Sequence, residues 1–198
     1  MYQNEKVDMR VKYTREWTFE ALARLLEVKK YENIKISEII TKAGISRATF
    51  YRNFSTKDDI VKIKARVFFE DFFSSVFEYF SKNEQEDEQF LISSFFKRID
   101  EEDKLVDTVI KTKQEYLMVN GILELINLRR EQFYQIVKIN KKAEKYTMEI
   151  VASSTWTLLS RWYQSGKEES PQELSEIYSE AFKSIYIALY GDKTELNK

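Results

Sequence analysis

The sequence has no cysteine and no histidine among its 198 residues, and it holds 4 glycines and 1 proline. The first two absences exclude disulfides, cysteine nucleophiles, histidine general bases and the common zinc sites. The scarcity of turn-forming residues favours long helices with few connections, so we expect an all-α protein. An enzyme would need carboxylate, lysine or tyrosine chemistry. Because no paired catalytic motif or phosphate-binding glycine loop supports this, we expect no catalytic activity, no metal and no other cofactor.

Charge is distributed unevenly along the chain. Residues 1–65 carry 14 basic against 9 acidic side chains, and the remainder carries 18 against 24, for a formal net charge of -1. A basic end on a near-neutral chain indicates a polyanion partner there, with chance clustering as the alternative. The N-terminus shows no apolar run of signal-peptide length, and no stretch approaches the ~20 apolar residues that span a membrane. We expect a soluble, cytoplasmic protein without a membrane partner.

Apolar residues at helical spacing predict helices along most of the sequence. The polar stretch SKNEQEDEQ (81–89) is the clearest linker, and Gly121 is a natural break between two helices. Near the C-terminus, Ser170 and Glu173 form a capping box with Pro171 at the first helical position. The expected helices cover residues 14–30, 36–43, 47–53, 58–80, 88–99, 104–119 and 122–139, followed by one that ends near residue 166 and a last one from residue 171.

The stretch GISRATFYRNFSTKDDI (44–60) has the pattern of a helix-turn-helix. Gly44 is expected to end a short helix, and Ser46 to cap the next one. Phe50 and Phe54 would fix this second helix to a core, so that its outward face is presented rigidly. That face carries donors suited to base edges and phosphates in a major groove, whereas an ordinary helical hairpin is the simpler alternative.

These residues resemble the N-terminal domain of the TetR family of bacterial transcriptional regulators. The family pattern is an apolar helix, a short second helix, alanine-glycine, an apolar residue, serine, and later TFYRxFxxKxxL. The resemblance covers about residues 10–65. The matching positions are AGIS (43–46), TFYR (49–52), Phe54, Lys57 and Ile60. Asn53 stands where the family often has histidine, which puts one backbone contact in doubt.

The resemblance implies a site for double-stranded DNA. Arg47 and Thr49 are the candidates for reading bases, with a non-specific phosphate contact as the alternative for Arg47. Tyr51 and Lys57 are expected to contact phosphates, and the free N–H groups at the start of the fourth helix could hold a phosphate as well. The alternative for Lys57 is a solvated lysine. Arg52 is expected on the DNA backbone.

Two serines and three structural residues complete this site. Ser37 is expected either to hold a phosphate or simply to cap the second helix. Ser46 belongs to the DNA-binding set, while Gly44, Phe50 and Phe54 form the turn and core of the motif.

The resemblance also divides the chain into a helix-turn-helix DNA-binding domain (1–65) and a helical dimerisation and effector or partner domain (66–198). The last two long helices are expected to form a four-helix bundle in a homodimer that binds a pseudo-palindromic operator. The expected dimer interface comprises Trp162, Leu174, Ile177, Tyr178, Phe182, Ile185 and Leu189.

Two functions remain open for the C-terminal part. The leading one is a dimeric repressor released by a small-molecule effector, for which aromatics of the fourth helix could line a pocket, with core packing as the simpler alternative. The segment RWYQSGKEESPQEL (161–174) also resembles a Gram-positive subgroup related to dihydroxyacetone kinase regulators, some of which act with a protein partner. The second function is therefore a co-regulator whose C-terminal domain binds another protein.

The acidic run DEEDKLVD (100–107) raises the question of a metal site. Its spacing does not fit a calcium loop, and no glycine supplies the sharp turn that such a loop needs. We therefore expect a solvated helix junction there.

Overall fold

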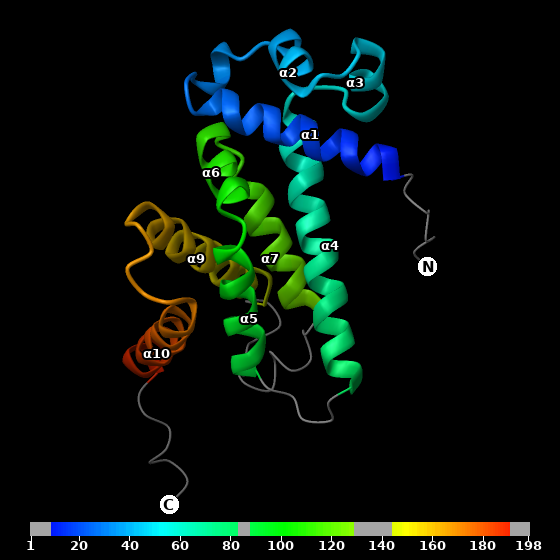
Figure 1. Ribbon diagram of the computed structural model, residues 1–198. Coiled ribbons are helices and arrows are strands. Elements are labelled where there is room, and N and C mark those ends of the chain that lie inside the picture. Colours follow the sequence, from blue (N-terminus) through cyan, green and yellow to red (C-terminus); the bar gives the residue numbers. More distant parts are fainter. Residues whose placement is uncertain (1–8, 83–87, 129–143, 191–198) are drawn as a thin grey trace, which may run out of the picture.

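The computed structural model describes residues 9–82, 88–128 and 144–190, which are helical without a strand, and this confirms the all-α expectation (Figure 1). Its elements are α1 (Met9–Leu26), η1 (Tyr31–Asn33), α2 (Ile36–Ala43), α3 (Arg47–Asn53), α4 (Asp58–Lys82), α5 (Glu88–Asp100), α6 (Asp103–Thr112), α7 (Tyr116–Leu128), α9 (Glu144–Gln164) and α10 (Pro171–Tyr190). Within the described ranges, no helix combines the length and the apolar character needed to cross a membrane.

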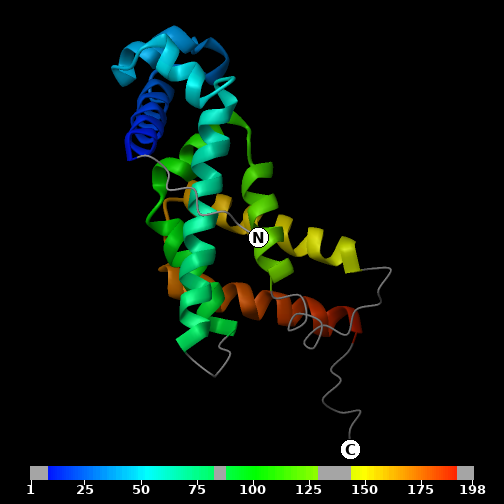
Figure 2. The ribbon, with the colours of Figure 1, turned by 90° about the vertical axis from the view of Figure 1, so that its right-hand side faces the viewer.

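The helices form a small head on a larger body. The head consists of α1, η1, α2 and α3, and the body consists of α5, α6, α7, α9 and α10 (Figure 1). Helix α4 begins in the head and descends through the body as one unbroken helix of 25 residues. Figure 2 shows that α9 and α10 extend away from α4. The expected domain boundary at residue 65 falls inside α4, so both parts share this helix, and the division itself stays a prediction.

One apolar core runs from the head into the body. Leu22 and Phe50 in the head, Val61 on α4, and Val109 and Leu159 in the body are all fully buried and belong to a single cluster. Burial of such side chains stabilises a fold by roughly 1.5–3 kcal/mol each. The head is therefore packed against the body through a shared apolar core.

The expected helix over residues 104–119 is wrong, because the structure ends α6 at Thr112. Lys113 adopts a left-handed conformation with φ 57°, and the Gln114 N–H donates to the Val109 carbonyl over 3.0 Å. This is a Schellman ending made by a lysine, so no glycine marks it in the sequence. Residues 129–139 of the expected helix 122–139 lie outside the described part of the chain.

Gly121 is not a break but a contact inside α7. A Cβ built on it would lie 2.1 Å from Cε2 of the Phe69 ring on α4. Glycine is needed here because two helices approach closely, not because a helix ends. The α10 start follows the sequence pattern, since the Ser170 N–H donates to the Glu173 carboxylate over 2.8 Å.

Candidate nucleic-acid interface

The turn between α2 and α3 is built by local backbone chemistry. Gly44 follows α2 with φ 66°, a conformation that glycine adopts without the steric cost of a Cβ. The N–H of Ile45 then donates to the Ile40 carbonyl over 3.2 Å, which closes the end of α2. Ser46 caps α3, because its hydroxyl oxygen accepts the Thr49 N–H over 3.1 Å. These contacts fix the angle between the two short helices.

Two phenylalanines hold α3 against the head. Phe50 is fully buried, Phe54 is 3% exposed, and their ring centres lie 5.3 Å apart. They pack with the buried side chains of Ile39 on α2 and Ile60 on α4 in the shared core. The remaining face of α3 is therefore held in one orientation toward the solvent.

The outer face of α3 exposes Arg47, Ala48, Tyr51 and Arg52. The Arg47 guanidinium lies 5.4 Å from the centre of the Tyr51 ring, so the ring holds the cation over itself. The sequence interpretation missed Ala48, although its position one turn before Arg52 already places it on this face. Its side chain is small, so it covers little of the helix backbone on this face.

The hydroxyl groups of this motif are partly engaged within the chain. The hydroxyls of Ser46 and Thr49 share a hydrogen bond of 2.8 Å, and the Asn53 amide donates to the Thr49 carbonyl over 2.9 Å. Ser37 is exposed, and Lys35 stands at the N-cap position of α2 in its place. The alternative that Ser37 caps α2 is therefore wrong, whereas its phosphate contact stays a prediction.

Lys57 is bound within the head and is not a solvated lysine. Its ammonium donates to the carbonyls of Tyr31 and Ile34 over 2.7 and 3.1 Å. It also lies 4.2 Å from the centre of the Tyr31 ring. Lys57, the residue before α4, thus connects the start of that helix to η1 through these hydrogen bonds. Two of the three N–H donors of its ammonium group are used in this way.

The two residues before Lys57 have their N–H groups bound within the chain, next to the start of α4. The N–H groups of Ser55 and Thr56 both donate to the Asp59 carboxylate over 2.8 Å. The Thr56 N–H is the main reason why the pKa of Asp59 lies below its ordinary value. Tyr31 donates its hydroxyl proton to Asp58, and burial together with this bond raises the pKa of Tyr31 above its usual range. A phosphate here would meet two carboxylates.

The variant Lys57→Met separates an internal tether from a phosphate contact. If Lys57 is a tether, two carbonyls lose a charged donor, and urea denaturation should show a loss of about 1–3 kcal/mol in the free energy of unfolding. The slope of log K for DNA against log salt should not change. Lys62→Met, which removes an exposed lysine in the first turns of α4, is the control. A slope reduced by ~0.9 with unchanged stability would instead assign Lys57 to a phosphate.

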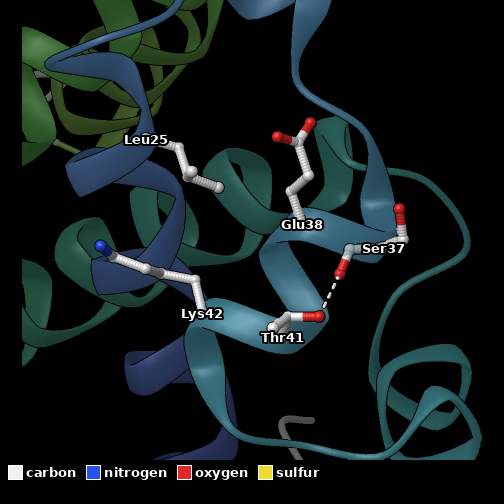
Figure 3. A pocket seen from close by; sticks show the side chains of 5 residues that line it. All are labelled: Leu25, Ser37, Glu38, Thr41 and Lys42. Atoms are coloured by element: carbon white, nitrogen blue, oxygen red, sulfur yellow. Dashed lines mark hydrogen bonds between the residues drawn. The ribbon is translucent and has the colours of Figure 1, made fainter.

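A shallow, open depression lies between the end of α1 and the outer side of α2 (Figure 3). Leu25, Ser37, Glu38, Thr41 and Lys42 line it. The Thr41 hydroxyl donates to the Ser37 carbonyl over 3.0 Å, and Glu38 is paired with Lys29. Ser37, Thr41 and Lys42 are exposed on this side of α2.

The residues expected at the dimer interface fall into different environments. Trp162, Leu174 and Tyr178 are buried within one chain, with 4%, 4% and 9% of their surfaces exposed. The Trp162 indole N–H donates to the Glu169 carbonyl over 2.9 Å, and the hydroxyls of Tyr178 and Thr155 are 2.7 Å apart. The expectation that these three side chains face a second subunit is therefore wrong, because they form the contact of α9 and α10 with the chain's own core.

The other expected interface residues lie further along α10. Ile177 is 46% exposed, and Phe182 is half-buried with its ring centre 4.6 Å from that of Tyr178. The side chains of Ile185 and Leu189 lie outside the described part of the chain. On α9, Tyr146 and Ile150 are each 66% exposed.

The fold and this surface define a helix-turn-helix protein with a helical body. Residues 19–62 match the family model of the bacterial regulatory proteins of the tetR family. No curated protein matches the sequence. The N-terminal part is therefore a TetR-family DNA-binding domain, which confirms the resemblance, and the chain is a DNA-binding transcriptional regulator.

Solved structures share the fold over nearly the whole chain. Lin0861 from Listeria innocua is 20% identical with a TM-score of 0.74, covering 93% of this chain and 97% of that one. The dihydroxyacetone kinase operon activator DhaS is 18% identical with a TM-score of 0.53, covering 86% and 94%. The fatty acid degradation regulator FadR from Bacillus halodurans is 16% identical with a TM-score of 0.56, covering 83% and 92%. At these identities the likeness concerns the fold.

Proposed function

We propose that this regulator binds a pseudo-palindromic operator as a homodimer, with one α3 in each of two successive major grooves. The observation that carries this proposal is the outer face of α3, where Arg47, Ala48, Tyr51 and Arg52 are exposed while Phe50 is fully buried. A helix fixed in this way can present donors to base edges without reordering.

Each side chain has a proposed role on DNA. Arg47 reads a base, and Thr49 does so to the extent that its hydroxyl is released from Ser46. Tyr51 and Arg52 contact phosphates. Ser37 and Ser46 add hydroxyl contacts to the DNA backbone at the edges of the motif.

The test is fluorescence anisotropy of the purified protein on the duplex upstream of its own gene, at two salt concentrations. A scrambled duplex of the same composition is the control. The proposal expects binding to the upstream duplex that is at least about 10³-fold tighter than to the scrambled one. Equal and weak binding to both duplexes would contradict it.

The proposed dimer uses the exposed apolar side chains of α9 and α10. Tyr146 and Ile150 on α9 and Ile177 on α10 leave apolar surface in water, and the Thr155–Tyr178 hydrogen bond holds the two helices together. Large apolar side chains left exposed on a chain are typical of an interface. The last two helices of two chains would then form the four-helix bundle.

Ile177→Asp is expected to shift the protein from dimer to monomer in analytical ultracentrifugation, with a dissociation constant raised at least about tenfold. This variant is preferable to Phe182→Asp, because Phe182 also packs on Tyr178 and its loss would disturb the fold. Val28→Asp, at a residue of the head that is 77% exposed, is the control. A dimer unaffected by Ile177→Asp would place the interface elsewhere.

The regulatory role proposed first is repression that a small-molecule effector of the body relieves. Effector control requires that the ligand bind the two orientations of the head with different affinity. The second candidate is a co-regulator that binds another protein through α9 and α10 in place of a second chain, for which the exposed Tyr146 and Ile150 would then be available. One solved structure of similar fold is named an operon activator, and membership of its subgroup stays a prediction. Melting curves with candidate metabolites separate the two, since only an effector raises the melting temperature.

A further inference from the structure

The corner between α5 and α6 is largely exposed, as its sequence suggested, but its side chains are also paired across the fold. We call residues 100–104 (DEEDK) the acidic corner. Its side chains pair with cations and anions from α1, α4, α5 and the turn between α9 and α10. Because α1, α4 and the α9–α10 turn are distant from it in sequence, the acidic corner is a meeting point of the tertiary structure.

On the body side, the acidic corner holds Lys167 of the α9–α10 turn. The Lys167 ammonium donates to the carboxylate and the carbonyl of Asp100 over 2.7 and 3.0 Å, and it also pairs with Asp103. Hydrogen bonds to these two aspartates outweigh the effect of burial and raise the pKa of Lys167. The lysine is therefore charged at neutral pH and bound at the start of α6.

The backbone at Lys167 is unusual for a lysine. Its φ is 57°, directly after Gly166 with φ 93°, and such left-handed conformations are unfavourable for residues with a Cβ. The Lys167 N–H donates to the Trp162 carbonyl over 2.9 Å, which closes the end of α9. Glycine would adopt this left-handed conformation with less steric strain than lysine. We attribute the presence of lysine here to the contacts of its side chain.

On the head side, the acidic corner reaches α1 and α4. Lys104 pairs with Glu20 of α1 over 2.7 Å. Glu102 lies 3.9 Å from Lys64 of α4, which in turn donates to Glu16 of α1 over 3.1 Å.

The burial of each ion pair determines how much it contributes to stability. Lys104 is 63% exposed, and an isolated exposed pair contributes little. Lys64 and Glu102 are each only 19% exposed, and Arg98 pairs with Glu102 over 3.2 Å. The inner part of the corner is thus a shielded network, in which each charge has more than one partner.

We infer that the acidic corner positions the head on the body, and that Lys167 links this position to the α9–α10 turn. Pairing or partner binding at α9 and α10 would then bias the orientation in which α3 meets DNA. The part of this inference that concerns DNA rests on the proposed function. The part that concerns head orientation does not.

The first test measures head orientation without DNA. Because the chain has no cysteine, spin labels on Glu32→Cys in η1 and Glu124→Cys in α7, both exposed positions, report one distance between head and body. Labelled protein is diluted with unlabelled protein so that each assembly holds one labelled chain. Lys167→Met should make the distance distribution at least about twice as wide, and Lys167→Arg should restore much of its narrowness.

The matched control is Lys111→Met. Lys111 forms a salt bridge with Asp107 inside α6, at a distance of 2.7 Å. Replacing Lys111 therefore removes a salt bridge of α6 but leaves the contacts of Lys167 intact. Glu102→Gln serves as a second test variant if Lys167→Met lowers the melting temperature, because Glu102 is shielded and has two cationic partners. A distribution that stays as narrow as in the unchanged protein for both Lys167→Met and Glu102→Gln would overturn the inference.

The second test uses the upstream duplex and a double-mutant cycle. Lys167→Met and Glu102→Gln, which weakens the shielded network around Lys64 and Arg98, should each weaken DNA binding about fivefold. The double variant should weaken DNA binding by clearly less than the product of the two single effects. The reason is that the second change removes an interaction that the first has already made ineffective. Effects that simply multiply would contradict a shared link. If the unchanged protein binds no duplex, the proposed function fails, and the distance measurement still decides the inference.

Discussion

Gly121→Ala is expected to lower the free energy of unfolding by about 2–3 kcal/mol, measured by urea denaturation. The new Cβ would lie 2.1 Å from Cε2 and 2.3 Å from Cδ2 and Cζ of the Phe69 ring. That ring is 4% exposed and lies 5.0 and 6.2 Å from the rings of Phe68 and Phe95, so it cannot move without disturbing its neighbours. The better helix propensity of alanine recovers only ~1 kcal/mol.

Asn120→Ala tests whether the effect comes from packing. Asn120 is the exposed neighbour of Gly121 in the same helix, and its replacement should leave stability unchanged or raise it by a few tenths of a kcal/mol. Adding Phe69→Leu to Gly121→Ala should cost less than the sum of the single changes, because the smaller side chain removes the clash. Additive effects would mean that the close approach of α4 and α7 is not what requires glycine.

Ala48→Glu is expected to weaken DNA binding by at least about 100-fold in anisotropy while the melting temperature stays nearly constant. Ala48 is exposed at the centre of the outer face of α3, beside Arg47 and Arg52. A carboxylate there would face phosphates, and like-charge contacts across an interface cost several kcal/mol. Glutamate is a good helix former, so the fold of α3 should survive.

Ala48→Lys is the matched variant, since it adds a side chain of similar length with the opposite charge. If charge is decisive, the lysine variant should bind non-specific DNA at least as well as the unchanged protein and show a steeper salt dependence. Equal loss for both variants would point to a steric limit at this position. Unchanged binding by the glutamate variant would remove α3 from the DNA interface.

The head could be predicted from sequence because its structure depends on neighbouring residues. Gly44 supplies the left-handed turn, Ser46 caps α3, and the spacing of Phe50 and Phe54 places both on the inner side. The role of Lys57 could not be predicted in this way. Its ammonium binds carbonyls 26 and 23 residues earlier in the chain, and no local pattern contains that contact.

In the body, the periodicity of apolar residues predicts the helices but not which side chains are buried. The stripe on α10 is wide enough to serve two neighbours, and the sequence does not tell which side chains face α5 and which face the solvent. Tyr178 packs on Phe96 of α5, whereas Ile177, the residue before it, is exposed. Gly121 was misread for a related reason, since a glycine that ends a helix and a glycine that admits a ring look identical in a sequence.

The unbroken course of α4 has a geometric consequence for reading DNA. At 1.5 Å per residue, its 25 residues form a rod about 37 Å long that starts beside α3 and ends at the far end of the body (Figure 1). A tilt of about 5° about its lower end would carry the upper end roughly 3 Å, which is close to the 3.4 Å rise of one base pair. A rearrangement of side chains in the body, too small to change the fold, is thus enough to shift the recognition helix by one step along the groove.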